Sequence, residues 1–336
     1  MKTIILKPEN GAAEAARLIK AGQVVGIPTE TVYGLGANAL DRNAVLKIFA
    51  AKGRPADNPL IVHIADFRQL SDLVTNIPDK AKKLADAFWP GPLTMIFGCQ
   101  ETVPRETTGG LDTVAIRLPS HPTAKKIIQL AGCPIAAPSA NISGRPSPTS
   151  ADHVFEDMDG KIPLIVDGGE CHVGVESTVI SMVCDPPLLL RPGGITPGQI
   201  ESVIGPIAID PSVTGNVQVE KASSPGMKYK HYSPRAAVTL LHGDSRKYIT
   251  FVNTSAEDGA IALCFDEEAP FLDIPFITLG KSAGYEDQAH LLFSALRRAD
   301  KTGAKKVYAH CPAKEGVGLA VFNRLVRAAG FDERWL

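Results

Sequence analysis

The chain has 336 residues, of which 44% are hydrophobic and 21% charged, and its formal net charge is −1. This length allows two domains with sizeable cores, and the composition is that of an ordinary globular protein. The balance of charges excludes a general electrostatic attraction to nucleic acid or membrane, so any contact with a polyanion must come from a local patch.

The cysteines and the N-terminus indicate the compartment. None of the six cysteines forms a CxxC pair, which argues against a structural zinc site and favours reduced thiols. The first apolar run, residues 4–6, is too short for a signal peptide, and no stretch approaches the ~18 apolar residues of a membrane span. We therefore expect a cytoplasmic protein with no membrane contact.

Hydrophobic periodicity in the first 205 residues alternates between strand and helix and predicts an α/β fold. The expected helices are 9–22, 42–51, 79–88, 121–131 and 197–204. The expected strands are 24–27, 60–64, 93–97, 113–118, 134–137, 162–166, 179–182 and 188–191.

The periodicity stops between Gly205 and Arg235, where the sequence indicates neither helix nor strand and is rich in Pro, Ser and Gly. Loops of this length are usually functional or disordered, so we interpret the stretch as a linker. A second alternation of strands and helices, in a β-α-β pattern, follows and predicts a small domain with a mostly parallel sheet. Its expected strands are 238–241, 260–265, 276–279 and 306–310, and its expected helices are 246–251, 285–299 and 318–329.

Two neighbouring segments carry the strongest chemical signal. Residues 28–36, PTETVYGLG, follow an apolar run, and the pattern predicts one turn that contains hydroxyls, a carboxylate and two glycines. Lys52 and Arg54 then lie on a loop bent by Gly and Pro. Turn chemistry beside a buried strand, with cations nearby, predicts a pocket for an anionic ligand. Taken alone, Lys52 and Arg54 could equally be solvated charges at a helix C-terminus.

Common catalytic and nucleotide-binding motifs are missing. Residues 169–174 have the glycine spacing of a P-loop, but Val175 stands where the lysine belongs. We find no credible Ser/His/Asp triad. The loop 138–144 could donate hydrogen bonds to a ligand or be an ordinary turn. The segment 228–235, KYKHYSPR, could stack bases, be a basic linker, or fold over the pocket as a lid.

Seven segments in order along the first 200 residues resemble the threonylcarbamoyl-AMP synthase family. They are PTETVYGLG (28–36), KGRPADNPL (52–60), FWPGPLT (88–94), VAIRLP (114–119), APSANISG (137–144), ESTVI (176–180) and LRPGGIT (190–196). The linker and the second α/β region are similar to the longer, two-domain form of this family.

The resemblance implies a fold and an activity. Residues 1–205 would form a catalytic domain with a twisted, mixed YrdC-like sheet, 206–235 a linker that serves as active-site lid, and 236–336 a smaller Rossmann-like domain with a parallel sheet. The enzyme would be a nucleotidyltransferase that joins L-threonine, bicarbonate or CO2, and ATP into threonylcarbamoyl-AMP and pyrophosphate. A separate tRNA threonylcarbamoyl transferase complex would then modify an adenosine beside the anticodon.

The resemblance also implies the site residues. The catalytic cationic and polar group would be Lys52, Arg54, Ser139 and Asn141. The ATP contacts would be Arg54, Asn58, Thr113, Ser139, Ser147, Arg191 and, from the linker, Tyr232. The L-threonine pocket would be Thr31, His63, Arg117, Ser177 and the backbone of Ala137. Mg²⁺ is expected with ATP, but the sequence identifies no metal-ligating side chains.

Three other interpretations stay open at this point. An RNA-binding module without catalysis is favoured by the basic and aromatic segment 228–235. Through this segment the protein could also contact tRNA weakly. A carbamoyltransferase that uses carbamoyl phosphate would be expected to carry repeated CxxC motifs, and none is present. A purely structural scaffold is the least favoured, because so many hydrogen-bonding groups crowd into residues 29–36.

Overall fold

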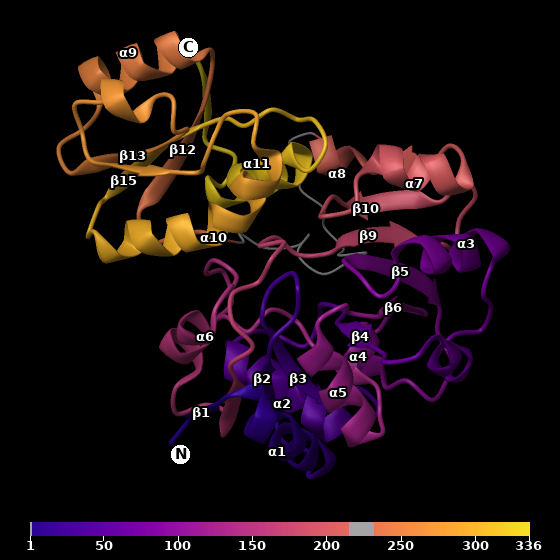
Figure 1. Ribbon diagram of the computed structural model, residues 1–336. Coiled ribbons are helices and arrows are strands. Elements are labelled where there is room, and N and C mark those ends of the chain that lie inside the picture. Colours follow the sequence, from indigo (N-terminus) through magenta and orange to yellow (C-terminus); the bar gives the residue numbers. More distant parts are fainter. Residues whose placement is uncertain (1, 215–231) are drawn as a thin grey trace. The chain divides into compact units, whose positions relative to one another are not determined.

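The computed structural model describes residues 2–214 and 232–336, which form two compact units (Figure 1). The first unit consists of the described residues of 1–143, 147–172 and 176–228. The second unit consists of 144–146, 173–175 and the described residues of 229–336. Two short segments from the N-terminal part of the sequence therefore belong to the second unit.

The described residues of the first unit form an eleven-stranded mixed sheet. Across the sheet the strands are β1 (Ile4–Leu6), β8 (Leu164–Val166), β2 (Val25–Ile27), β3 (Gly34–Asn38), β7 (Ile135–Ala136), β4 (Ile61–His63), β6 (Thr113–Arg117), β5 (Leu93–Gly98), β9 (Thr178–Ser181), β10 (Leu188–Arg191) and β11 (Ala208–Ile209). The pairs β1–β8, β8–β2, β4–β6, β5–β9 and β10–β11 are parallel, and the others are antiparallel. The predicted mixed α/β sheet is confirmed.

Helices bury their apolar stripes against this sheet in two separate cores. Helices α1 (Pro8–Lys20) and α5 (Pro122–Ala131) pack over β8, β2 and β7. Helices α2 (Arg42–Lys52), α3 (Asp79–Phe88), α6 (Ala151–Met158) and α7 (Pro197–Ile204) contribute to the larger core. The shorter elements are η1 (Phe67–Asp72), α4 (Arg105–Thr108) and α8 (Pro211–Thr214).

The ends of α2 show how the sequence fixes an element that matters for the site. The Asp41 carboxylate accepts hydrogen bonds from the backbone N–H groups of Asn43 and Ala44, which caps the first turn. Gly53 adopts a left-handed conformation, with φ of +64°, and ends the helix directly after Lys52. This cap fixes the end of the helix, so that Lys52 is the last helical residue and Arg54 lies on the loop that follows.

The two glycines of the PTETVYGLG segment do not form a turn, as the sequence suggested, but belong to strand β3. Neither has a positive φ. A Cβ on Gly34 would lie 3.0 Å from the Cβ of Ala137, and a Cβ on Gly36 would lie 3.1 Å from Ile135. These glycines therefore allow close packing on the sheet, which local sequence does not distinguish from a turn.

The expectation that residues 205–235 contain no helix or strand is wrong for residues 208–214. Strand β11 pairs in parallel with β10 and extends the sheet, and α8 follows it. Residues 215–231 lie outside the described residues. The sequence also missed β1, α6 and β16 (Glu333–Trp335), of which β1 and β16 have only three residues each and so give little periodicity.

Within the described residues, the second unit contains one sheet of five strands, all parallel. Their order is β14 (Phe276–Thr278), β13 (Ala260–Cys264), β15 (Lys306–His310), β12 (Ala237–His242) and β16. Helix α9 (Ser245–Ser255) covers one face, while α10 (Tyr285–Lys301) and α11 (Gly318–Ala328) cover the other, and η2 (Ala269–Phe271) is a short turn (Figure 1). The predicted parallel-sheet domain is confirmed.

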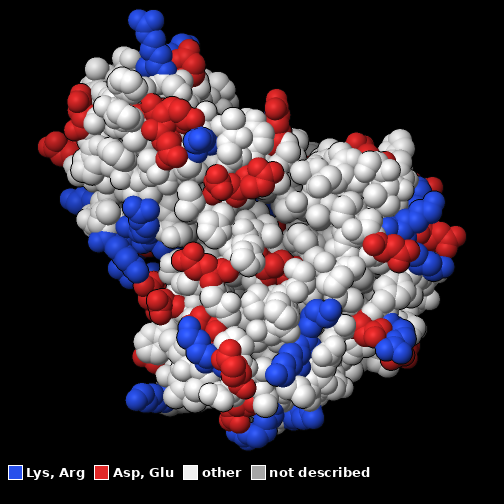
Figure 2. All heavy atoms as spheres, viewed as in Figure 1, with Lys and Arg blue, Asp and Glu red and all other residues white. Residues whose placement is uncertain are grey.

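Surface features of the described residues agree with the composition. On the face shown in Figure 2, basic and acidic side chains are interspersed, and the described residues form no continuous basic stripe across it. No helix among them combines the length and the apolar character needed to cross a membrane. The six cysteines, all in the described part of the chain, form no disulfide.

We predict that Gly36→Ala destabilises the first unit. The added Cβ would press on Ile135 and Ile27, and overpacking of this kind costs about 1–3 kcal/mol. Gly198→Ala is the matched control, because a Cβ there meets nothing within 4 Å. Urea denaturation of both variants should show a lower midpoint only for Gly36→Ala; equal midpoints would contradict the packing role of Gly36.

Candidate active site

One face of the central strands of the first unit carries several of the predicted site residues. Strand pairing places His63, Arg117 and Thr94 in one row across β4, β6 and β5. Because side chains alternate along a strand, these three point to the same face. An apolar cluster of Ile61, Ile96, Ala115, Val179 and Leu190 lies next to them on this face. We call this surface, with its polar row and apolar cluster, the polar sheet face.

Arg191 reaches the polar sheet face because strand β10 is irregular. The register of β9 and β10 shifts between Leu189 and Arg191, so that Leu189 opposes Ile180 and Arg191 opposes Val179. Strict alternation would turn Leu190 and Arg191 to opposite faces. The β-bulge instead places Arg191 opposite Val179, a residue of the polar sheet face.

A buried ion pair stands at the centre of this face. An Nη atom of Arg117 lies 2.7 Å from Oε1 of Glu30, and both side chains are less than a tenth exposed. Arg117 also donates hydrogen bonds to Thr31 Oγ1 at 2.9 Å and to the carbonyl oxygen of Gly91 at 3.3 Å. Thr31 in turn lies 2.9 Å from the hydroxyl of Thr29. The guanidinium is therefore held in one orientation.

Glu30 is a residue that sequence reasoning missed as part of the site. Burial raises the pKa of its carboxyl group, but the charge and hydrogen bond of Arg117, together with backbone hydrogen bonds, outweigh burial and leave the pKa below its ordinary value. Glu30 is thus ionised at neutral pH and neutralises Arg117. The only sequence signal was its place between Thr29 and Thr31, which does not reveal a partner in a distant strand.

His63 is a neutral histidine on the polar sheet face. Burial, followed by the nearby positive charge of Arg117, lowers the pKa of its imidazole to about 3. Its Nδ1 is buried and has no hydrogen-bond partner among the described residues. A buried polar atom without a partner is uncommon and is typical of a site that receives a ligand.

Ser177 lies at the other end of the polar row, just before β9. Its hydroxyl is 2.7 Å from that of Thr94, and Arg191 donates hydrogen bonds to both the carbonyl oxygen and the hydroxyl of Ser177, at 3.0 and 3.2 Å. Any Cβ on Gly193 would overlap the backbone at Ser177 and Thr178. The glycine of the RPGG segment therefore permits a close approach that fixes Ser177.

Lys52 ties the end of α2 to the loop 138–144. Its buried ammonium donates hydrogen bonds to the carbonyl oxygens of Ser139 and Asn141 and, at 3.4 Å, to Asn141 Oδ1. Burial, followed by the charge of Arg54, holds the pKa of Lys52 well below its ordinary value, against the opposing charges of Asp157 and Glu176. All three N–H donors of the ammonium are engaged with this loop.

Arg54 and Asn58 flank this group on the loop after α2. The guanidinium of Arg54 lies 5.2 Å from the centre of the Phe49 ring, a cation–π contact that restrains the side chain. Asn58 is fully buried, and neither amide atom has a hydrogen-bond partner among the described residues. As at His63 Nδ1, this is the state of a group that a ligand would satisfy.

The remaining predicted residues are placed as follows. Ser147 is buried and donates a hydrogen bond of 2.5 Å to Glu176 Oε1. Ala137 already donates its backbone N–H to the carbonyl oxygen of Ile61, so only its carbonyl is left to act. Thr113 starts β6 opposite Gly98, two residues along the strand from Ala115 and four from Arg117. It therefore lies on the polar sheet face but away from the polar row.

Tyr232 belongs to the second unit. Its backbone has a positive φ of 65°, and its buried ring lies 5.2 Å from Phe293 and 5.7 Å from the guanidinium carbon of Arg324. Its contact with ATP stays a prediction. Residues 228–231 of the predicted lid lie outside the described residues.

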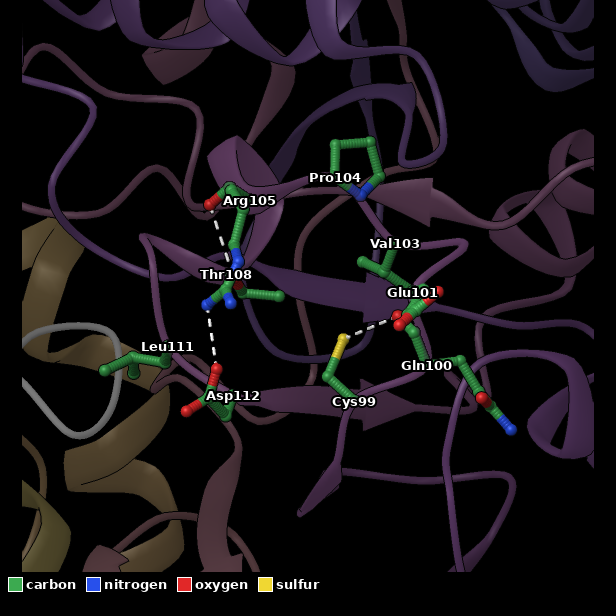
Figure 3. Close-up of a pocket in the computed structure, with 9 residues that line it drawn as sticks. All are labelled: Cys99, Gln100, Glu101, Val103, Pro104, Arg105, Thr108, Leu111 and Asp112. Atoms are coloured by element: carbon green, nitrogen blue, oxygen red, sulfur yellow. Dashed lines mark hydrogen bonds and ion pairs between the residues drawn. The ribbon is translucent and has the colours of Figure 1, made fainter.

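The described part of the first unit also contains a surface pocket that does not include the predicted site residues. Among the described residues, no group of three or more His, Cys, Asp or Glu side chains is arranged to hold a metal ion. A pocket of about 400 Å³ is lined by Cys99, Gln100, Glu101, Val103, Pro104, Arg105, Thr108, Leu111 and Asp112 (Figure 3). It contains none of the predicted site residues, and an exposed ion pair of Arg105 and Asp112, 2.8 Å apart, lies at its edge.

Two family models match nearly the whole chain. The model described as "Telomere recombination" (Sua5_yciO_yrdC) matches residues 17–193, and the model described as "Threonylcarbamoyl-AMP synthase, C-terminal domain" matches residues 195–330. These matches define a two-domain enzyme of the nucleotidyltransferase class. The chain belongs to the threonylcarbamoyl-AMP synthase family.

Relatives and solved structures agree with the family. The chain is 53% identical to the threonylcarbamoyl-AMP synthase of Pyrococcus abyssi, over 94% of this chain and 93% of the relative, and 49% identical to that of Bacillus subtilis, over 95% and 92%. A double variant of P. abyssi Sua5 matches with a TM-score of 0.93 and 49% identity over 99% of this chain and 98% of its own. The crystal structure of P. abyssi Sua5 complexed with L-threonine matches with a TM-score of 0.91 and 48% identity over 100% and 99%.

We predict that His63→Gln flattens the pH dependence of stability. His63 has a folded pKa of about 3, below its unfolded value near 6.5, so the unfolded state binds a proton that the folded state does not. The free energy of unfolding then falls by up to ~1.4 kcal/mol per pH unit as pH drops below 6.5. Removing the imidazole abolishes the contribution of His63 to this pH dependence. Urea denaturation from pH 7.5 to 5 measures it, with the exposed His172→Gln as control; profiles that coincide for wild type and His63→Gln would contradict the assignment.

We also predict that Glu30→Gln is strongly destabilising at neutral pH. It leaves the buried Arg117 charge without its counter-charge, which costs about 3 kcal/mol or more. Because the Glu30 pKa is lowered by folding, its stabilising effect is present above the unfolded pKa and is lost as pH falls through the folded pKa. The variant and the wild type should therefore converge in acid.

Glu14→Gln is the control for this substitution, because it breaks an exposed pair with Arg17, and exposed pairs contribute little to stability. Denaturation midpoints at pH 7 and pH 4 provide the measurement. A Glu30→Gln protein as stable at pH 7 as the Glu14→Gln protein would show that the buried pair is not essential.

Proposed function

We propose that this enzyme makes threonylcarbamoyl-AMP and pyrophosphate from L-threonine, ATP and bicarbonate or CO2. The observation that carries the proposal is the full-length likeness, at 48% identity, to P. abyssi Sua5, whose crystal structure holds L-threonine. The proposal is also supported by the polar sheet face, where buried hydrogen-bonding groups surround a fixed arginine.

In this proposal L-threonine binds over the polar row of the sheet. Arg117 uses three of its five N–H donors on Thr31, Gly91 and Glu30, which leaves two for the amino-acid carboxylate. The neutral His63 and the hydroxyl of Ser177 recognise the polar groups of the substrate, and the carbonyl oxygen of Ala137 accepts from its amine. Hydrogen bonds to the threonine hydroxyl would favour threonine over alanine, because a missing partner leaves a buried polar group unpaired.

ATP binds, in this proposal, through the loops beside the row. Arg54 and Arg191 neutralise the phosphates, Asn58 and Ser139 donate hydrogen bonds, as does Thr113 at the start of β6, and Ser147 contacts the nucleotide beside its hydrogen bond to Glu176. Tyr232 contributes from the linker. Asn58 supports this assignment most directly, since its buried amide lacks a partner among the described residues.

Lys52 acts through its position. With its side-chain nitrogen hydrogen-bonded to Ser139 and Asn141, it holds the loop that carries these two residues in place. Lys52, Arg54, Ser139 and Asn141 thus form the catalytic group of the proposal, in which Lys52 orders the others. A preorganised positive environment costs no rearrangement when charge develops on the phosphate.

The reaction needs alignment rather than a protein nucleophile. The amine of threonine adds to CO2 and loses a proton, which gives a carbamate. A carbamate oxygen then attacks the α-phosphorus of ATP, and the bond to pyrophosphate breaks. When bicarbonate is the source, one water is released as well. Holding carbamate and ATP side by side supplies most of the catalysis in such a displacement.

Mg²⁺ enters this proposal with ATP. The described residues offer no cluster of three metal ligands, and Mg²⁺ commonly binds through substrate phosphates with few protein carboxylates. The chain's own part is to supply arginines and amide groups around the phosphates.

The product then passes to a tRNA threonylcarbamoyl transferase complex, which places the group on an adenosine beside the anticodon. In this proposal the enzyme acts in the cytoplasm, and any contact with tRNA is weak, because the net charge of −1 and the interspersed charges of Figure 2 provide no extended basic surface on the face shown.

Pyrophosphate release tests the proposed function and the role of Arg54. With ATP and bicarbonate, release by the wild type should require L-threonine and should fall sharply with L-alanine, which lacks the hydroxyl. Arg54→Ala should lower kcat/KM for ATP on the order of 100-fold, because it removes a cation from the phosphates, and should leave stability nearly unchanged. Arg68→Ala is the control, since Arg68 is 89% exposed. Threonine-independent release would contradict the reaction, and wild-type kinetics in Arg54→Ala would contradict its role.

A further inference from the structure

The second unit holds two short segments that continue directly into site residues of the first unit. Residues 144–146 precede Ser147, and residues 173–175 precede Glu176. Ser147 and Glu176 are themselves joined by a hydrogen bond of 2.5 Å. Each partner of this bond is therefore one peptide bond away from a segment that packs within the second unit.

The contacts that hold the first segment come from α10 and from the residue after Tyr232. Arg297, only 2% exposed, donates a hydrogen bond of 2.6 Å from Nη2 to the carbonyl oxygen of Pro146. Ser233 donates its backbone N–H to the carbonyl oxygen of Gly144 at 2.9 Å. An Nη atom of Arg145 lies 4.0 Å from Oδ2 of Asp300, and Asp300 is near the end of the same helix. All three residues of the segment thus have a polar contact in the second unit.

The second segment touches the same helix through its glycine. Gly174 has a φ of +78°, and any Cβ there would overlap the backbone at Ala289 and His290. The chain can approach α10 this closely only because residue 174 lacks a side chain. Helix α10 therefore holds both segments, one by a charged hydrogen bond and the other by direct backbone packing.

Ser177, by contrast, is fixed within the first unit. Thr94 and Arg191 hold its side chain and carbonyl, and the N–H of Thr178 donates to the carbonyl oxygen of Pro92. A displacement of the two segments would thus act on Ser147 and Glu176 before it reached Ser177 or the polar row.

We propose that α10 of the second unit positions Ser147 for ATP through its hold on residues 144–146 and 173–175, with Arg297 as the positioning residue. This inference rests on the proposed function, in which Ser147 contacts ATP. It gives the C-terminal region a part in nucleotide affinity that is separate from any lid. Binding of L-threonine, which relies on the polar row, does not depend on Arg297.

Titration calorimetry with α,β-methylene-ATP and with L-threonine tests this proposal. Arg297→Ala should weaken nucleotide binding roughly tenfold, the effect of losing one charged hydrogen bond, and should change threonine binding less than twofold. Arg297→Lys, which keeps a charged donor, should recover part of the affinity. Arg298→Ala is the matched control, because Arg298 is the neighbouring arginine on α10 and is exposed.

A double-mutant cycle separates positioning from general damage. If Arg297 acts through Ser147, Arg297→Ala should have almost no further effect on nucleotide affinity in a Ser147→Ala background. Independent, additive losses, or a loss in Arg298→Ala equal to that in Arg297→Ala, would overturn the proposal.

Gly174→Ala is a second test of the proposal in case Arg297→Ala does not fold. The Gly174→Ala substitution changes no charge. It should weaken α,β-methylene-ATP binding, whereas Gly169→Ala should not, because Gly169 has a similar positive φ of +87° but open space around a Cβ. Equal nucleotide affinity in both glycine variants would overturn the proposal. The proposed function would be contradicted by a different result, threonine-independent pyrophosphate release by the wild type. The binding measurements need no turnover, so the two failures can be distinguished.

Discussion

The buried ion pair between Glu30 and Arg117 is the interaction on which the site depends. An arginine on the face of a packed sheet is tolerable only when its charge is neutralised and its donors are used. Glu30 meets the first condition, and Thr31 and Gly91 meet the second. The fixed positive charge in turn helps to keep His63 neutral. The polar sheet face is thus ordered before a substrate arrives.

Two different kinds of scaffold meet in this site. The proposed threonine side is built on strands, so its spacing is set by sheet register and by the bulge at Leu190 and Arg191. The proposed phosphate side is built on loops, which need other restraints. Lys52 supplies one of these by binding the carbonyl oxygens of the loop 138–144. The proposed catalysis by alignment requires both parts to be rigid, and buried hydrogen bonds restrain both of them.

Family membership and the proposed chemistry account for the motifs that were absent from the sequence. Displacement at phosphorus by a carbamate needs no Ser/His/Asp triad, and ATP held by arginines and amides needs no P-loop. The RNA-binding module without catalysis is excluded, because the chain belongs to a family of nucleotidyltransferases. The inferred part of α10 extends this picture, since residues outside the catalytic sheet would tune nucleotide affinity.

The sequence by itself determined the elements with strong periodicity and the family. Helix 79–88, strand 188–191 and strand 306–310 have the predicted bounds, because their apolar patterns and terminal residues are local signals. Only the tertiary structure decided that Gly34 and Gly36 lie in a strand, that a bulge turns Arg191 to the polar sheet face, and that Glu30 pairs with Arg117. Each of these depends on contacts between segments far apart in the chain, which local patterns do not encode.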